Sequence, residues 1–429
     1  MAVERGLSGL KSASKGLDVT SNNIANASTV GYKASVTHFG DVYASSLAGA
    51  GASQVGIGNS VAAIQQQFTQ GNLTSTNNPL DISINGAGFF KMDNNGATTY
   101  SRNGQFHLDK NGYIVNDQAL KLTGYAAQSG IIVPSTPAAI QISASDLPPI
   151  ETGTSTSAGF TGVKANLQLD SRVSVPTVTP WVGATGPLYT PDPQSYSYST
   201  ALSVYDSLGN PHALTMYFVK TATPGQWQTH FNVDGTSDAY VTPQGTNMTF
   251  DSAGKLTSTP VALSINLASV NAALSLPSNA SSPMAFNVDF TGTTQFGSAF
   301  GTNRLEQDGY AAGHLVGLSV GSDGVIQGRY SNGQTFAQGQ IVMANFTNPN
   351  GLQSLGNNQW TETSVSGPAL IGAPNTSNLG ILSSSTVEES NVDLTAELVN
   401  LITEQRNYQA NAQSIKTQDQ VLQTLVNLR

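Results

Sequence analysis

The chain has 429 residues, and only 10% of them are charged, compared with roughly 25% in an ordinary soluble domain. Seventeen basic against twenty-six acidic residues give a formal net charge of −9, which argues against nucleic-acid binding because that function needs clustered Lys and Arg. The sequence contains no Cys, which excludes thiolate nucleophiles, disulfides and iron–sulfur ligation.

The N-terminus is predicted to form a helix with one apolar face. Its apolar side chains recur at alternating steps of three and four residues, with Ser14 and Ser21 filling the missing positions. The opposite face is polar, so the pattern is that of a coiled-coil seam about three heptads long. The residues predicted on this seam are Val3, Leu7, Leu10, Leu17 and Ile24.

Between the terminal segments the sequence predicts β structure. Asn-Gly turn dipeptides separate short apolar runs between residues 78 and 127, and similar turns return between 323 and 351. Two such segments far apart in the sequence predict one β domain that is interrupted by an insertion. The insertion opens with the Pro-rich stretch 147–150 and carries strand-like runs of its own.

A second and longer helix is predicted from Leu394 to Leu428, because neither Gly nor Pro interrupts this stretch. At 1.5 Å per residue it would be about 50 Å long. Its seam is predicted to contain Leu394, Leu398, Leu401, Tyr408, Ile415, Leu422 and Leu425. We expect the two one-sided helices to pair with each other and with other copies of the chain; the alternative is that both pack on a single globular core.

The predicted fold class is therefore α+β and mostly β, with nested domains and long coiled-coil-like terminal helices. The predicted boundaries are 1–35 and 388–429 for the terminal helical domain, 36–75 and 370–387 for connectors, 76–146 and 305–369 for an inner all-β domain, and 147–304 for an inserted outer all-β domain.

The sequence predicts no catalytic residues, no cofactor and no metal site. The segment Gly317–Gly321 fits the G-x-S-x-G pattern of hydrolases, but a turn rather than a helix is expected after it. The last His is His314, so no His follows the serine to complete a triad. The five His are scattered, with no pair at helical i, i+4 spacing, which argues against a zinc-protease motif.

No window of the sequence approaches the ~18 apolar residues that a membrane-spanning helix needs. The first residues also lack the apolar run and the cleavage site of a secretory signal. We therefore expect no membrane insertion and, for an exported protein, a route without a cleaved signal peptide.

The most informative motif spans residues 22–33, at the end of the first apolar stripe. Its three asparagines, Asn22, Asn23 and Asn26, are poor helix formers, and Gly31 can adopt the left-handed conformation that ends a helix. The motif thus predicts a helix end that passes into an extended segment, with amide side chains bonded to neighbouring backbone. Such amides would fix the register if buried between subunits, or form an ordinary frayed end if exposed, and composition does not decide between the two.

Three blocks resemble the bacterial flagellar axial proteins, the rod and hook family. The first is the N-terminal signature, with Asn22, Asn23, Asn26, Thr29, Gly31, Tyr32 and Lys33. The second is similar to a motif of distal rod and hook members, with Asn78, Pro79, Leu80, Asp81, Gly86, Gly88, Phe89 and Phe90. The third runs from Val387 to Thr417 and resembles the C-terminal helix of the family.

Within this family, distal rod members are much shorter than this chain, so the inserted segment favours the hook branch. The resemblance implies a structural subunit of a curved tubular polymer that joins rod to filament as a universal joint. It further implies that the terminal helices form an inner tube, with their seam residues between subunits. A distal rod protein is the alternative within the family, and a surface adhesin is the alternative outside it.

The resemblance also implies the partners of the chain. These are further copies of itself, the distal rod protein, a hook cap protein, a hook–filament junction protein and the flagellar type III export apparatus. The implied location is the extracellular hook of the flagellum, without membrane insertion.

Overall fold

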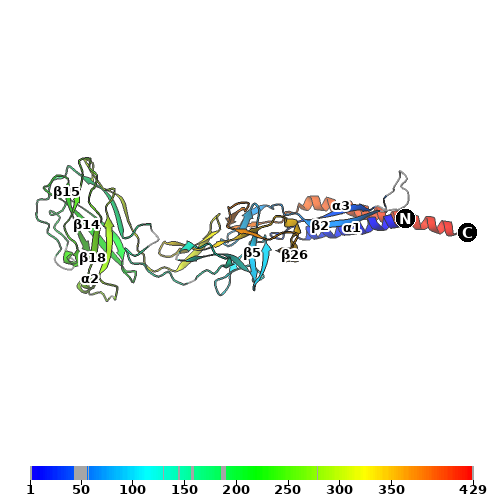
Figure 1. Ribbon diagram of the computed structural model, residues 1–429, viewed down its shortest axis with the longest axis horizontal. Helices are drawn as coiled ribbons and strands as arrows, with labels where there is room; N and C mark the ends of the chain where they lie inside the picture. Colours follow the sequence, from blue (N-terminus) through cyan, green and yellow to red (C-terminus); the bar gives the residue numbers. More distant parts are fainter. Residues whose placement is uncertain are drawn as a thin grey trace. The chain divides into compact units, whose positions relative to one another are not determined.

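The computed structural model describes residues 2–42, 56, 58–128, 130–143, 145–155, 159–184, 190–277 and 279–427. Among these residues, two long helices frame the chain: α1 spans Ala2–Ala25 and α3 spans Leu394–Asn427. A short helix, α2, spans Leu267–Ala273, and most of the remaining regular structure is β (Figure 1). The predicted fold class, α+β and mostly β, is confirmed.

The chain divides into two compact units. The first unit contains residues 1–143, 317–329 and 335–429, and the second contains residues 144–316 and 330–334. The first unit is thus assembled from both ends of the chain, with the second unit inserted in its sequence.

The first unit contains most of the strands. They are β1 Ser35–Val42, β2 Gly58–Gln66, β3 Leu73–Ser75, β4 Ile82–Asn85, β5 Phe89–Asn94, β6 Ala97–Ser101, β7 His107–Leu108, β8 Ile114–Val115, β9 Lys121–Gln128, β10 Ile131–Ile132, β11 Ala138–Ala139, β22 Leu315–Val320, β23 Val325–Tyr330, β24 Thr335–Ile341, β25 Met343–Asn345, β26 Gln353–Gly356, β27 Gln359–Thr361, β28 Leu370–Gly372, β29 Ile381–Ser384 and β30 Thr386–Glu388. The main sheet follows the order β22-β23-β24-β9-β5-β6-β27-β26.

Small antiparallel pairs connect the two ends of the chain within the first unit. Strand β3 pairs with β30, β4 pairs with β29, and β5 pairs with β25. Each pair joins a strand from the first quarter of the sequence to one that follows the insertion. This pairing positions the end of α1 beside the start of α3.

The second unit is built from two sheets around one core. Its strands are β12 Val163–Asp170, β13 Tyr198–Tyr205, β14 Pro211–Lys220, β15 Gln226–Val233, β16 Val241–Thr242, β17 Thr246–Thr249, β18 Val261–Ile265, β19 Met284–Asp289, β20 Thr294–Phe296 and β21 Gly301–Gln307. One sheet has the order β16-β18-β19-β12-β20, with β21 on β12, and the other has the order β13-β14-β15-β17. Alternating burial along β12 is the pattern of a strand with one face on a core.

The segments expected as connectors contain regular structure. In 36–75, strands β1 and β2 form an antiparallel hairpin, and β3 pairs with β30. In 370–387, β28 pairs with β25 and β29 pairs with β4. The Gly- and Ser-rich composition of these segments concealed their strands, because such residues are poor strand formers in isolation.

Candidate functional site

The two terminal helices pack against each other through small residues of α1. A Cβ atom added to Gly6 would lie 2.8 Å from Ile415, and one added to Gly9 would lie 2.7 Å from the Asn411 side chain. A Cβ added to Gly16 would lie 3.1 Å from Glu404. Positions 6, 9 and 16 progress toward higher numbers while their partners on α3 progress toward lower ones. The helices are therefore antiparallel, and the lack of a side chain at these three positions of α1 permits their close approach.

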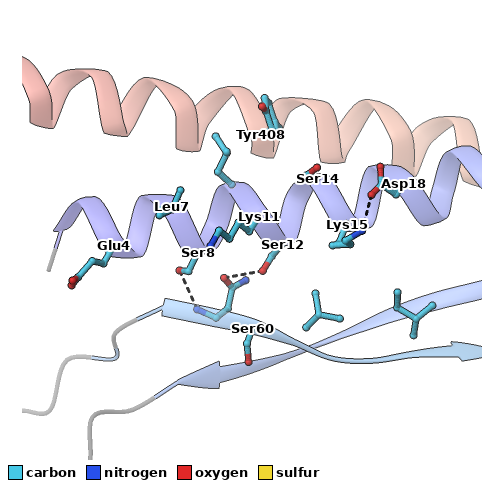
Figure 2. Close-up of a pocket in the computed structure, with 14 residues that line it drawn as sticks. Glu4, Leu7, Ser8, Lys11, Ser12, Ser14, Lys15, Asp18, Ser60 and Tyr408 are labelled. Atoms are coloured by element: carbon cyan, nitrogen blue, oxygen red, sulfur yellow. Dashed lines mark hydrogen bonds and ion pairs between the residues drawn. The ribbon is translucent and has the colours of Figure 1, made fainter.

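The hairpin β1–β2 covers another side of α1 (Figure 2). The Ser12 hydroxyl donates to Asn59 Oδ1 at 3.2 Å, and the Asn59 backbone N–H donates to Ser8 Oγ at 3.4 Å. Helix α1 therefore has α3 along one side and a polar contact with the hairpin along another.

The apolar residues predicted at a subunit interface lie largely outside this glycine seam. Leu7 is 44% exposed, and Leu10, Leu17 and Ile24 are half-buried. On α3, Leu401 and Ile415 are half-buried, whereas Leu394, Leu398, Tyr408 and Leu422 are exposed. The side chains of Val3 and Leu425 lie outside the described residues. Within one chain, a set of large apolar side chains is thus left partly open, and their role between subunits stays a prediction.

The N-terminal signature forms a hydrogen-bonded turn at the end of α1. Asn22 Nδ2 donates to the Tyr32 hydroxyl at 3.0 Å, and that hydroxyl donates to Asn23 Oδ1 at 3.1 Å. Asn23 also exchanges two bonds with the backbone of Ser35, since its Nδ2 donates to the Ser35 carbonyl and its Oδ1 accepts from the Ser35 N–H. The amides therefore bond neighbouring backbone, as expected, and Asn23 Nδ2 also reaches Glu397 Oε1 of α3 at 3.1 Å.

The rest of this turn is held by Asn26, Thr29 and Gly31. Asn26 Nδ2 donates to the Asn22 carbonyl, and the Thr29 hydroxyl donates to Asn26 Oδ1. Gly31 has a φ of 72°, and a Cβ there would lie 2.7 Å from the backbone nitrogen of Asn103. Both observations require glycine, because other residues rarely adopt this φ and a side chain would not fit.

A buried ion cluster connects the end of α1, the β sheet and the segment before α3. Lys33 Nζ donates to Glu388 Oε1 at 2.6 Å and to the Thr69 carbonyl at 2.8 Å. Arg102 donates to Glu388 Oε2 at 3.2 Å and to the Gly86 carbonyl at 2.9 Å. The Lys33 and Glu388 side chains are fully buried and that of Arg102 is 4% exposed. Desolvation lowers the pKa values of Lys33 and Arg102, while Glu388 opposes this effect.

The second motif block forms a structural corner of the first unit. Asn78 and Asp81 make an Asx-type turn, in which Asn78 Oδ1 accepts from the Leu80 N–H and Asn78 Nδ2 donates to Asp81 Oδ1. The Pro79 carbonyl accepts from the Ser384 hydroxyl, and Gly86 supplies its carbonyl to the ion cluster through Arg102.

The end of the same block enters the core. Phe89 makes edge contacts with Phe68, Phe346 and Trp360, and Phe90 packs edge-on against Phe106 at 5.2 Å. Gly88 has a φ of 126° and leaves space for the Met343 methyl group, 2.9 Å from the position a Cβ would take. The motif therefore joins the sheet to the ion cluster by packing and hydrogen bonds.

Five residues that make these contacts were not predicted from the sequence: Gly6, Gly9, Gly16, Arg102 and Glu388. The glycines repeat on one face of α1, so their spacing carried a signal for close helix contact. Arg102 and Glu388 are separated by 286 residues, and nothing in a single sequence pairs them.

Metal binding and membrane insertion are two other kinds of function on which the structure bears. Across the described part of the chain, no group of three or more His, Asp or Glu side chains has a geometry that could hold a metal ion. Among the described helices, none combines the length and the apolar character that crossing a bilayer requires.

Four protein-family models match the chain. The flagella basal body rod protein model matches residues 5–33, and the flagellar hook protein FlgE/F/G D1 domain matches 83–145. The flagellar basal body protein FlaE D2 domain matches 166–310, and the flagellar basal body rod FlgEFG protein C-terminal model matches 383–428. The D2 model falls within the second unit, 144–316, which contains none of the three sequence blocks that resemble the family.

Several curated proteins are similar over their full length. The flagellar hook protein FlgE of Escherichia coli K12 is 41% identical over 435 residues, covering 100% of both chains. FlgE of Salmonella typhimurium is 41% identical over 436 residues with the same coverage. FlgE of Borreliella burgdorferi is 30% identical over 451 residues, covering 99% of this chain and 98% of its own.

A solved structure supports the fold. The crystal structure of Helicobacter pylori flagellar hook protein FlgE2 superposes with a TM-score of 0.51 at 13% identity, covering 74% of this chain and 99% of that one. The matches of the family models in chain order, together with full-length similarity to hook proteins of distant bacteria, show that the chain belongs to the flagellar hook protein family, FlgE.

Proposed function

We propose that this chain is the subunit of the flagellar hook and polymerises into a curved tube that transmits torque from the rod to the filament. The full-length similarity to hook proteins of distant bacteria carries this proposal. The match of the D2 model to residues 166–310 favours the hook over the shorter distal rod proteins. The role is structural and needs no catalytic residue or cofactor.

The terminal helices would form the inner wall of the tube. Support comes from the exposed apolar side chains on α3, among them Leu394, Leu398 and Leu422, which a single chain leaves in contact with water. Burying such side chains between copies is favourable by about 25 cal/mol per Å² of apolar surface. In this arrangement residues 1–35 and 388–429 are the inner-tube domain, the strands of the first unit between them form the connector and the inner β domain, and the second unit, residues 144–316 and 330–334, is the outer β domain.

The polymer would have specific neighbours at its two ends. The distal rod protein lies at its base and a hook–filament junction protein at its tip, and a hook cap protein covers the tip during growth. Subunits would reach the extracellular tip through the flagellar type III export apparatus without a cleaved signal peptide.

The deciding experiment is electron microscopy of basal bodies from cells that lack this one gene, with a strain carrying the restored gene as control. Complete rods without hooks are expected. Truncated rods would instead assign the chain to the distal rod, and intact flagella would contradict the flagellar role and favour a surface adhesin.

A further inference from the structure

The second unit contains a pocket that the proposed function does not use. It has a volume of about 610 Å³, which falls within the ~300–1,000 Å³ of small-molecule pockets. It lies between the end of α2, the start of β14 and the end of β15, three elements labelled in Figure 1. Its lining residues, all in the described part of the chain, are Asp206, Asn210, Pro211, His212, Ala213, Asp234, Asn271, Leu274, Leu276 and Pro277.

The polar side of this pocket carries negative charge. His212 lies between two carboxylates, with Nδ1 at 2.6 Å from Asp234 Oδ2 and Nε2 at 3.5 Å from Asp206 Oδ2. The Asp206 side chain is fully buried and that of Asp234 is 18% exposed. Two carboxylates outweigh one imidazole whether or not the imidazole is protonated, and among the described lining residues none is Lys or Arg. The pocket therefore attracts a cation.

Backbone hydrogen bonds fix these carboxylates before any ligand arrives. Asp206 Oδ1 accepts from the N–H groups of Leu208 and Asn210, at 2.9 and 2.8 Å. Asp234 Oδ1 accepts from the Ala213 N–H at 2.7 Å. A site whose charged groups are already held in place loses little conformational freedom when it binds, which favours affinity.

Asn271 is the second observation that indicates a ligand. Its side chain is 6% exposed, and no hydrogen bond joins its amide to another group within the described part of the chain. Burying an amide without a partner is costly, and native structures rarely keep such a group without a reason. Because Asn271 lines the pocket, a ligand bound there would supply the missing hydrogen bonds.

The remaining wall is apolar. Leu274, Leu276 and Pro277 line it, and Leu276 is 52% exposed. A ligand that matches both walls has a cationic head with several N–H donors and an aliphatic stem. A guanidinium fits this description better than an ammonium, because it is more weakly hydrated and its planar fork donates to a carboxylate and a neighbouring oxygen at the same time.

We propose that this pocket binds an aliphatic guanidinium, with its charged head at Asp234 and Asn271 and its stem on Leu276. The ligand is either a free small molecule or the arginine side chain of another protein chain, since both present the same chemistry. This inference goes beyond the proposed function and does not depend on it.

Isothermal titration calorimetry of the purified full-length chain tests the proposal with two probes of the same shape. These are n-pentylguanidinium and its neutral counterpart n-pentylurea. The cation should bind roughly tenfold more tightly or better, because charge-assisted hydrogen bonds are the stronger ones. Failure of the chain to bind the cation, or equal affinities for the two probes, would overturn the proposal.

Two variants assign the contacts within the pocket. Asp234→Asn should lower the affinity for the cation by roughly tenfold and change that for n-pentylurea by less than about twofold, since only the cation needs the charge. Asn271→Leu should weaken binding of both probes without lowering the urea midpoint of unfolding, because this amide has no partner to lose within the described chain. The matched control is Asn247→Leu, at an exposed position of β17 outside the pocket, which should change neither affinity.

Unchanged affinity for the cation in Asp234→Asn contradicts the proposal. If that variant does not fold, Asn271→Leu decides, and an affinity equal to that of Asn247→Leu rejects the site. The assembled polymer then distinguishes the two sources of the ligand. Polymer that binds n-pentylguanidinium as the isolated chain does assigns the pocket to a free small molecule, whereas polymer that no longer binds it assigns the pocket to an arginine of a neighbouring chain.

Discussion

Replacing Glu388 with Gln removes the carboxylate that faces both Lys33 and Arg102. The substitution preserves the size of the side chain and one oxygen that can accept hydrogen bonds, including the bond from the Gly71 N–H. It leaves an ammonium and a guanidinium group buried without their shared negative partner. The perturbation is therefore electrostatic rather than steric.

Breaking a buried ion pair by removing one partner costs about 3–5 kcal/mol. The lower end of this range is expected, because Gln keeps one acceptor, and it corresponds to a roughly 150-fold change in an opening equilibrium at 1.36 kcal/mol per factor of ten. Amide hydrogen exchange followed by mass spectrometry measures this change segment by segment. Peptides that contain Lys33, Thr69 and Glu388 should lose about two orders of magnitude of protection, whereas peptides of the second unit should not change.

The control is Glu389→Gln, the same substitution at the adjacent, exposed position. It should leave the exchange of the same peptides unchanged. If Glu388→Gln also leaves them unchanged, or if both variants lower protection equally, the cluster does not hold the ends of the first unit together and the reasoning is wrong.

Three further predictions concern other contacts. The hydrogen bond between His212 and Asp234, at 2.6 Å, raises the pKa of His212 above 6.5. The stabilisation that this contact gives the second unit is therefore present below about pH 6.5 and lost as the pH rises through the folded pKa. The free energy of unfolding in urea should fall accordingly between pH 5.5 and 9, and His212→Gln should abolish this fall. Burial lowers the pKa of His230 to about 4, so the second unit should lose up to about 3 kcal/mol as pH falls from 6.5 to 4, and acid unfolding of His230→Phe should show a smaller loss. Gly9→Leu raises helix propensity by roughly 0.8 kcal/mol, yet it should speed amide hydrogen exchange in α1, because the new side chain forces α1 away from Asn411. Ser21→Leu, at an exposed position of the same helix, is the control, and faster amide exchange in it would contradict this explanation.

The sequence predicted the terminal helices closely, because their periodic apolar residues and the lack of Gly and Pro in α3 are local signals. The prediction of one helix from Leu394 to Leu428 compares with α3 at Leu394–Asn427. The turn after α1 was also predictable, since Asn residues and Gly31 end helices through their own chemistry.

The contacts between elements were harder to predict from the sequence. Periodicity identified the large apolar residues of α1, whereas its contact with α3 uses Gly6, Gly9 and Gly16, which contribute by allowing close approach. The hairpin β1–β2 was hidden by its Gly- and Ser-rich surroundings. Lys33 and Glu388 are 355 residues apart, and a single sequence holds no information that pairs them.

The position of Glu388 has a consequence for the order in which the chain folds. When the N-terminal end arrives first, Lys33 and Arg102 are present long before the carboxylate that makes their burial tolerable. Strands β3, β4 and β5 likewise wait for β30, β29 and β25. Contacts of such long sequence separation form late and slowly. The first unit, with the helix pair it supports, is therefore complete only when the segment that carries β29, β30 and Glu388 has joined it.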